Sequence, residues 1–216
     1  MNMKRTILTA VIMLWMALYA CPAFASVEEK ADKGVAYDII YPVVHTDNKS
    51  AQDKINQDIY SHVESLMEGH NAGKYVKSRM RYEVKYEDDS LLSLKLNIGV
   101  WLGIGARPTG SCLGLVYDKK TGKRLPLSHF LKITLEQLCA GYRDHVYDSK
   151  GKVIRSEDGK RPYKPSKVSE EYYLLGNGGI ALLYPPYALS WRADGDTTIR
   201  FNAQEVDYFN RKNRAQ

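Results

Sequence analysis

The residue types that most often carry chemistry are present in this chain, but they form no familiar catalytic or metal-binding motif. The five histidines are scattered, and none belongs to the His-x-x-x-His or Cys-x-x-Cys spacings that commonly ligate metals. Ser111 stands between Gly110 and Gly114, which is not the Gly-x-Ser-x-Gly spacing of a nucleophile elbow. We therefore predict no catalytic residue, no metal site and no cofactor.

Three other patterns are equally unspecific. The Gly99–Gly105 stretch is rich in glycine, but no phosphate-loop lysine and no helix start follow it, so a phosphate site is not predicted. The acidic pairs Asp88–Asp89 and Glu170–Glu171 fall in a turn and at a strand start, where acids are ordinary surface residues rather than a glycosidase pair. Basic and aromatic residues are not interleaved as in known nucleic-acid-binding modules, so no nucleic-acid partner is expected.

Aromatic residues are the feature that stands above background. The chain has 16 tyrosines, several of them near predicted strand ends, and their amphipathic rings suit contacts with a protein or a glycan. The predicted contact surface consists of Trp101, Arg107, Tyr172, Tyr173, Tyr184, Tyr187 and Trp191. The same rings would also cap an antiparallel sheet, and both interpretations stay open.

The first 25 residues have the layout of an export leader. Lys4 and Arg5 precede the uncharged, largely apolar run 6–20, and the small residues of Ala23-Phe24-Ala25 suit cleavage after Ala25. We therefore predict a signal peptide over 1–25 and a secreted or periplasmic mature chain. Two alternatives stay open: a retained membrane anchor, and a lipoprotein with an acylated Cys21. A membrane partner is expected only in those two cases.

Removal of the leader changes both the charge and the cysteine count. Loss of Lys4 and Arg5 from 31 basic and 25 acidic residues lowers the formal charge from +6 to +4. This mild surplus favours anionic surfaces, although a solvated basic face explains it as well. Loss of Cys21 leaves Cys112 and Cys139, either as a disulfide or as two free thiols.

The hydrophobic periodicity predicts an α+β fold: an antiparallel sheet packed against two main helices, in two intertwined sub-halves. Strands are predicted at 35–44, 80–87, 92–100, 111–117, 124–127, 171–175, 180–184 and 198–201. Helices are predicted at 50–67, with Ser50 as its N-cap, and at 134–147 and 203–209.

Several short segments occur in an order that resembles a known family. They are Tyr41–Val44 before a helix, Tyr117–Lys123, Leu125–Leu131, Tyr172–Leu174 and Leu183–Tyr187. This order resembles the PdaC-like and RsiV-like paired extracytoplasmic domains of unknown function. Such domains occur in a lysozyme-sensing anti-sigma factor and ahead of the catalytic domain of a peptidoglycan deacetylase.

The resemblance implies two α+β halves, a PdaC-like half over 26–110 and an RsiV-like half over 111–216. One departure concerns the Gly-Ala-His segment of family members, because the segment Gly105–Pro108 has Arg107 in place of the histidine. The sequence also contains no deacetylase domain and no sigma-binding segment, so neither activity is implied.

The resulting hypothesis is an exported, non-catalytic envelope protein that binds a cell-wall glycan or a protein partner such as lysozyme. The competing class is an envelope hydrolase whose site is assembled only in three dimensions. It would require a cleft that joins His129 or His145 to a carboxylate.

Overall fold

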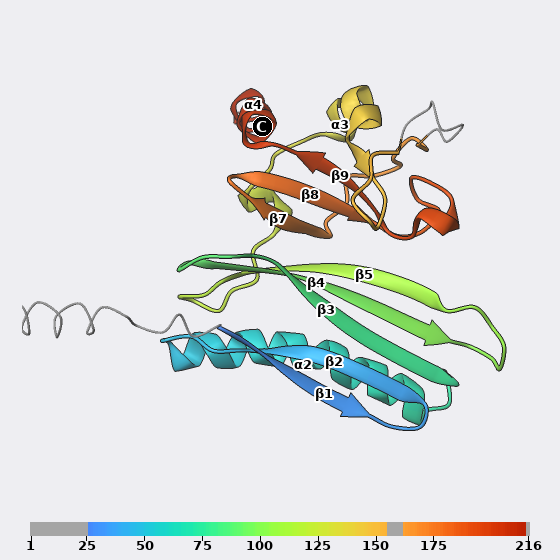
Figure 1. Ribbon diagram of the computed structural model, residues 1–216. Coiled ribbons are helices and arrows are strands. Elements are labelled where there is room, and N and C mark those ends of the chain that lie inside the picture. Colours follow the sequence, from blue (N-terminus) through green and yellow to red (C-terminus); the bar gives the residue numbers. More distant parts are fainter. Residues whose placement is uncertain (1–25, 155–161, 215–216) are drawn as a thin grey trace, which may run out of the picture.

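The computed structural model describes residues 26–154 and 162–214, so the predicted leader lies outside the described residues. Figure 1 shows four layers: a long helix, a five-stranded sheet, a four-stranded sheet, and two helices on the outer face. The α+β class is confirmed. The expectation of one antiparallel sheet is corrected, because the structure has two sheets and one of them is mixed.

The first sheet contains five strands in chain order. They are β1 (Val27–Lys33), β2 (Tyr37–Val44), β3 (Lys77–Glu87), β4 (Leu91–Trp101) and β5 (Thr109–Asp118). All neighbours are antiparallel except β2 and β3, which pair in parallel over Tyr37–Ile39 and Ser78–Met80. A parallel pair needs a long crossover connection, and helix α2 (Lys49–Asn71) provides it.

Helix α2 forms where apolar residues recur at helical spacing, which places them on one face. Its buried side chains Ile55, Ile59, Val63 and Leu66 share a core cluster with sheet residues that include Met80, Leu94 and Leu96. The N-cap of the helix lies two residues before the predicted one. Asn48, not Ser50, is the N-cap, and its side chain accepts hydrogen bonds from the backbone N–H groups of Ser50 and Ala51.

The second sheet is antiparallel throughout, with the order β6, β9, β8, β7. Its strands are β6 (Val146–Tyr147), β7 (Tyr172–Gly176), β8 (Gly179–Tyr184) and β9 (Thr197–Phe201). Helices α3 (Leu135–Gly141) and α4 (Ala203–Lys212) cover the face that points away from the first sheet (Figure 1). Short 3-10 turns complete the chain: η1 (Leu127–His129), η2 (Tyr142–His145) and η4 (Arg192–Asp194).

Three local predictions differ from the structure. The helix predicted over 134–147 ends at Gly141 and continues as the 3-10 turn η2. The strand predicted over 124–127 is reduced to a single bridge between Arg124 and Tyr117. Strand β1 was not predicted, because six of its seven residues are exposed and its sequence is mostly charged. The predicted boundary between the two halves, after residue 110, falls within β5, and the division into halves stays a prediction.

The two sheets pack face to face through a small cluster of Cys112, Tyr173, Ala181 and Leu183. The alternate residues of β7 and β8, such as Leu182, point to the other face and join the core beneath α3 and α4. The structure therefore has two main cores, one on each outer side of the paired sheets.

Candidate functional site

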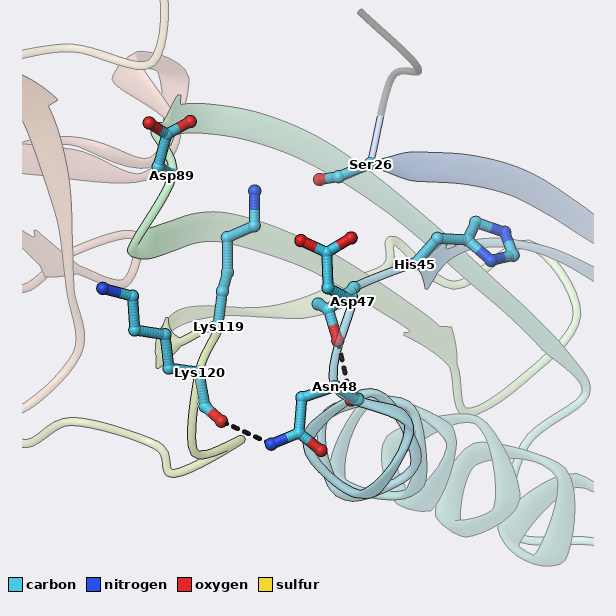
Figure 2. Close-up of a pocket in the computed structure, with 8 residues that line it drawn as sticks. Ser26, His45, Asp47, Asn48, Asp89, Lys119 and Lys120 are labelled. Carbon is cyan, nitrogen blue, oxygen red and sulfur yellow. Dashed lines mark hydrogen bonds between the residues drawn. The ribbon is translucent and has the colours of Figure 1, made fainter.

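A polar cleft of about 650 Å³ lies at the amino end of α2. It is lined by Ser26, His45, Thr46, Asp47, Asn48, Asp89, Lys119 and Lys120 (Figure 2). These residues come from the start of β1, the β2–α2 connection, the β3–β4 turn and the segment after β5. All eight residues have polar or charged side chains, whose hydrogen-bonding groups are available to a ligand.

Hydrogen bonds between distant segments fix one wall of the cleft. The Asn48 amide nitrogen donates to the Lys120 carbonyl oxygen at 2.9 Å, which joins the cap of α2 to the segment after β5. The Thr46 hydroxyl donates to the Asn48 carbonyl oxygen at 2.9 Å (Figure 2). These contacts hold the helix cap and Lys120 together before any ligand arrives.

The charged side chains of the cleft differ in whether they have hydrogen-bond or ion-pair partners. Lys119 Nζ lies 2.8 Å from Glu87 Oε1 and donates to the Asp88 carbonyl oxygen at 2.9 Å. Within the described parts of the chain, the carboxylates of Asp47 and Asp89 and the ammonium of Lys120 make no hydrogen bond or ion pair. The cleft therefore presents acceptors and a cationic donor to whatever enters it.

In the described chain, no hydrogen bond joins a histidine of the cleft to a serine or a cysteine. The Ser26 hydroxyl donates to the Glu87 carboxylate, which also forms an ion pair with Lys119. The His45 ring turns away from Lys119 (Figure 2), and its Nε2 lies 3.1 Å from Glu28 Oε2. The chemistry that this arrangement supports is recognition through hydrogen bonds and charge.

Three residues of the predicted contact surface lie in the core. Tyr172, Tyr173 and Tyr184 are each at most 3% exposed, so they cannot contact a partner. Burial raises the pKa of Tyr184 to about 12, and its hydroxyl donates to the Lys167 carbonyl oxygen at 2.9 Å. The Tyr172 hydroxyl donates to the Leu125 carbonyl oxygen at 2.8 Å. These rings fill the sheet cores, which is the alternative interpretation given above.

The other four residues of that surface lie at the opposite end of the molecule from the cleft. Trp101 ends β4, Arg107 belongs to the β4–β5 connection, and Tyr187 and Trp191 belong to the β8–β9 connection. Arg192 Nη2 donates to the Pro108 carbonyl oxygen at 2.6 Å and thereby links the two connections. Tyr187 and Trp191 are each 60% exposed.

Cys112 and Cys139, the two cysteines among the described residues, are both free thiols. Cys112 is buried between the sheets, and this burial raises the pKa of its thiol to about 12, with the carboxylate of Asp196 adding to the effect. Cys139 is half-buried on α3, and its sulfur donates to the Pro165 carbonyl oxygen at 3.5 Å. A buried thiol with so high a pKa is a poor nucleophile.

His145 does lie near a carboxylate, as the hydrolase hypothesis requires. Its Nε2 is 3.5 Å from Glu205 Oε1, between two clefts of about 290 and 420 Å³. However, the second oxygen of Glu205 accepts the backbone N–H of Asn202 at 2.8 Å in the capping box of α4. His145 Nδ1 lies 3.2 Å from the Arg200 carbonyl oxygen. The pair thus connects η2 to α4.

His129, the other histidine of that hypothesis, is exposed and packs edge-on against Phe130. In residues 26–154 and 162–214, no group of three or more His, Cys, Asp or Glu side chains is placed to hold a metal ion. No helix formed by these residues is long and apolar enough to cross a bilayer.

Sequence reasoning missed the cleft. The residues around Asp47 appear in sequence only as a loop before a helix, and Lys119 and Lys120 only as part of a turn. Asn48 and Lys120 are 72 positions apart, and no local pattern indicates that they meet. The sole signal in the sequence was that both segments are polar and follow buried strands.

Comparison with known proteins identifies the fold. No protein-family model matches the chain, and no curated protein matches it significantly. Seven solved chains are similar. A DUF3298 family protein from Pseudomonas aeruginosa PAO1 superposes with a TM-score of 0.55 at 13% identity, covering 84% of this chain and 92% of that chain. A DUF3298 family member from Bacteroides fragilis NCTC 9343 gives a TM-score of 0.48 at 16% identity, covering 85% and 91%. The first similarity shows a shared fold and no activity.

Proposed function

We propose that this chain is an exported, non-catalytic envelope protein whose cleft at the start of α2 binds a polar fragment of cell-wall glycan. The leader-like residues 1–25 and the resemblance to PdaC-like and RsiV-like extracytoplasmic domains support the location. The fold shared with DUF3298 proteins is compatible with it and carries no functional information of its own.

The observation that carries the proposal is a set of charged groups in one cleft, Asp47, Asp89 and Lys120, which have no ion-pair partner among the described residues. Lys120 and the helix amino end favour a carboxylate or another anionic group of a ligand. Asp47 and Asp89 accept hydrogen bonds from hydroxyl or amine groups. Wall glycans that carry peptide stems combine carboxylates, amines and hydroxyls, so their chemistry matches this lining.

The size of the cleft favours a glycan fragment over a whole protein. A volume of about 650 Å³ falls within the range of small-ligand sites, roughly 300–1,000 Å³. A stable protein partner such as lysozyme instead requires about 800 Å² of surface on each side. Binding of lysozyme is therefore treated as a competing outcome of the experiment.

Isothermal titration of soluble peptidoglycan fragments into the protein recovered from the cell envelope tests this proposal. Intact mass defines the amino terminus of that protein, which is expected to be Ser26. The Lys120→Glu variant should bind about tenfold more weakly, because it places a like charge against the anionic group of the ligand. Lys123→Glu is the matched control, since Lys123 is an exposed lysine of the same turn that does not line the cleft.

Three results would contradict the proposal. One is the absence of heat with any fragment, and another is equal weakening by the two lysine variants. The third is affinity for lysozyme alone, which would replace the glycan with a protein partner.

A further inference from the structure

Four chain connections lie at the end of the molecule opposite the cleft. They are residues 34–36, 72–76, 102–108 and 185–196, and Figure 1 shows the strand connections on the same side. Hydrogen bonds join them: Ser78 N to Ala36 O at 2.9 Å, Val76 N to Trp101 O at 2.8 Å, and Arg192 Nη2 to Pro108 O at 2.6 Å. The connections therefore share one end surface of the molecule.

This surface carries apolar side chains that nothing in the described structure covers. We call it the apolar end surface, and it consists of Val35, Val76, Leu102, Ile104, Tyr187 and Trp191. These are six of the twelve large hydrophobic side chains that are exposed among the described residues. Val35 and Ile104 are fully exposed. Exposed apolar side chains that gather on one part of a surface mark an interaction site more often than singly scattered ones do.

Positive charges outnumber negative charges around the apolar end surface. Lys74, Arg107 and Arg192 belong to the four connections, and Lys33 and Lys77 lie at the adjoining strand ends. Two carboxylates also lie at these strand ends: Asp32 beside Lys33, and Asp38, which pairs with Arg81.

The two acids within the connections point inward. Asp194 is 6% exposed and accepts the Ser190 hydroxyl at 2.5 Å. Asp196 lies 3.5 Å from the buried Lys95 ammonium. An approaching anionic surface thus meets cations and apolar tips, with no exposed carboxylate in the connections.

We propose that the apolar end surface docks onto an anionic lipid bilayer and inserts the tip of the β4–β5 connection into the headgroup region. Aliphatic tips with cations behind them, and a tryptophan at the level of the headgroups, are the features of interfacial membrane contacts. Leu102 and Ile104 are aliphatic, so they offer no flat face on which a sugar ring stacks. Both residues lie on the β4–β5 connection, and side chains on a connection at one end of the molecule can enter a fluid bilayer without a pocket that fits them.

This contact does not require acylation of Cys21 or retention of the leader. It also stands independently of glycan binding in the cleft, because the two surfaces share no residue. Either one can fail experimentally while the other holds.

Tryptophan fluorescence with vesicles tests the docking surface directly. The chain has three tryptophans, Trp15 in the predicted leader and Trp101 and Trp191 at this end. The exported form is titrated with phosphatidylcholine vesicles and with phosphatidylcholine vesicles that contain phosphatidylglycerol. A blue shift and sedimentation with the anionic vesicles are expected, together with weaker binding at high salt.

Two variants distinguish binding through this surface from nonspecific hydrophobic adsorption. Leu102→Ser combined with Ile104→Ser should weaken vesicle binding about tenfold, since two apolar side chains no longer enter the bilayer. The control is Leu135→Ser combined with Leu175→Ser, two leucines that are 40% exposed elsewhere and should bind as the parent does. Circular dichroism confirms that each variant is folded.

The proposal is overturned if the parent protein shows no blue shift and no sedimentation with anionic vesicles. The proposal is also overturned if the variant with serine at positions 102 and 104 binds anionic vesicles as tightly as the parent protein does. Binding that is equally strong to neutral vesicles and insensitive to salt would refute the anionic preference.

Discussion

At the scale of single residues, the sheets pack together because position 114 has no side chain. A Cβ atom there would lie 1.9 Å from the carbonyl oxygen of Tyr172. The Gly114 N–H donates to the Glu171 carboxylate at 2.7 Å, and Arg124 donates to the Gly114 carbonyl oxygen at 3.1 Å. The close approach of two backbones is therefore fixed by polar contacts on both sides of the glycine.

The Gly114→Ala substitution should lower the free energy of unfolding by about 3 kcal/mol, because neither backbone can move away without separating the sheets. Urea denaturation measures this change. Gly141→Ala is the control, since a Cβ atom at Gly141 has nothing within 4 Å. Equal stability of the two variants would show that the sheets are not in close contact at this point.

Residue type alone does not show which aromatic rings of the predicted contact surface are exposed. Tyr172, Tyr184 and Tyr187 are the same residue type near predicted strand ends, but strand alternation and packing between layers decide which rings face solvent. The sequence does not reveal that further layers cover β7 and β8, so it does not show that the tyrosines of these strands are buried. Tyr187 and Trp191 remain exposed because their connection extends beyond the sheet.

At the scale of elements, the joint between β2 and β3 is the shortest pairing in the first sheet. It spans only three residue pairs, Tyr37–Ile39 with Ser78–Met80. Arg81 reinforces it by donating to the Asp38 carbonyl oxygen at 2.8 Å and to the Asp38 carboxylate. The Arg81 guanidinium holds the pKa of Asp38 below its usual value.

This depressed pKa predicts the acid behaviour of the joint. A carboxyl group with a lowered folded-state pKa contributes stability above its unfolded pKa, and the contribution is lost as the pH falls through the folded value. The melting temperature of the parent should therefore exceed that of Asp38→Asn near neutral pH, and the difference should close below about pH 4.

Thermal melts followed by circular dichroism across this range measure the effect. Asp53→Asn removes the same charge from an exposed pair with Lys49 on α2 and should change little at any pH. A difference between parent and Asp38→Asn that does not vary with pH would contradict the assignment.

Most elements were predictable from periodicity, and their assembly was not. The apolar repeat of α2 and the alternation of β3 and β4 are local signals, and all three elements were predicted within about four residues of their observed bounds. The pairing of β6 with β9 joins residues about fifty positions apart, and β6 has only two residues. Such a pairing depends on tertiary packing, so the second sheet was not predicted.

At the scale of the whole molecule, the strands of the first sheet separate two different surfaces. Strands β4 and β5 run between the apolar end surface and the polar cleft. A ten-residue strand such as β5 spans about 33 Å. If the apolar end surface rests on a membrane, the cleft therefore faces away from the lipid, toward the space that the wall occupies.

The central claim is that the cleft at the start of α2 is a binding site and not a catalytic one. NMR spectra of the protein amides and of the fragment, recorded during one titration with peptidoglycan fragments, locate the ligand and detect any turnover. The account predicts saturable shifts at residues 45–49 and 119–121 with the fragment spectrum chemically unchanged. Shifts confined to the surroundings of His145 and Glu205, accompanied by new product signals, would contradict it.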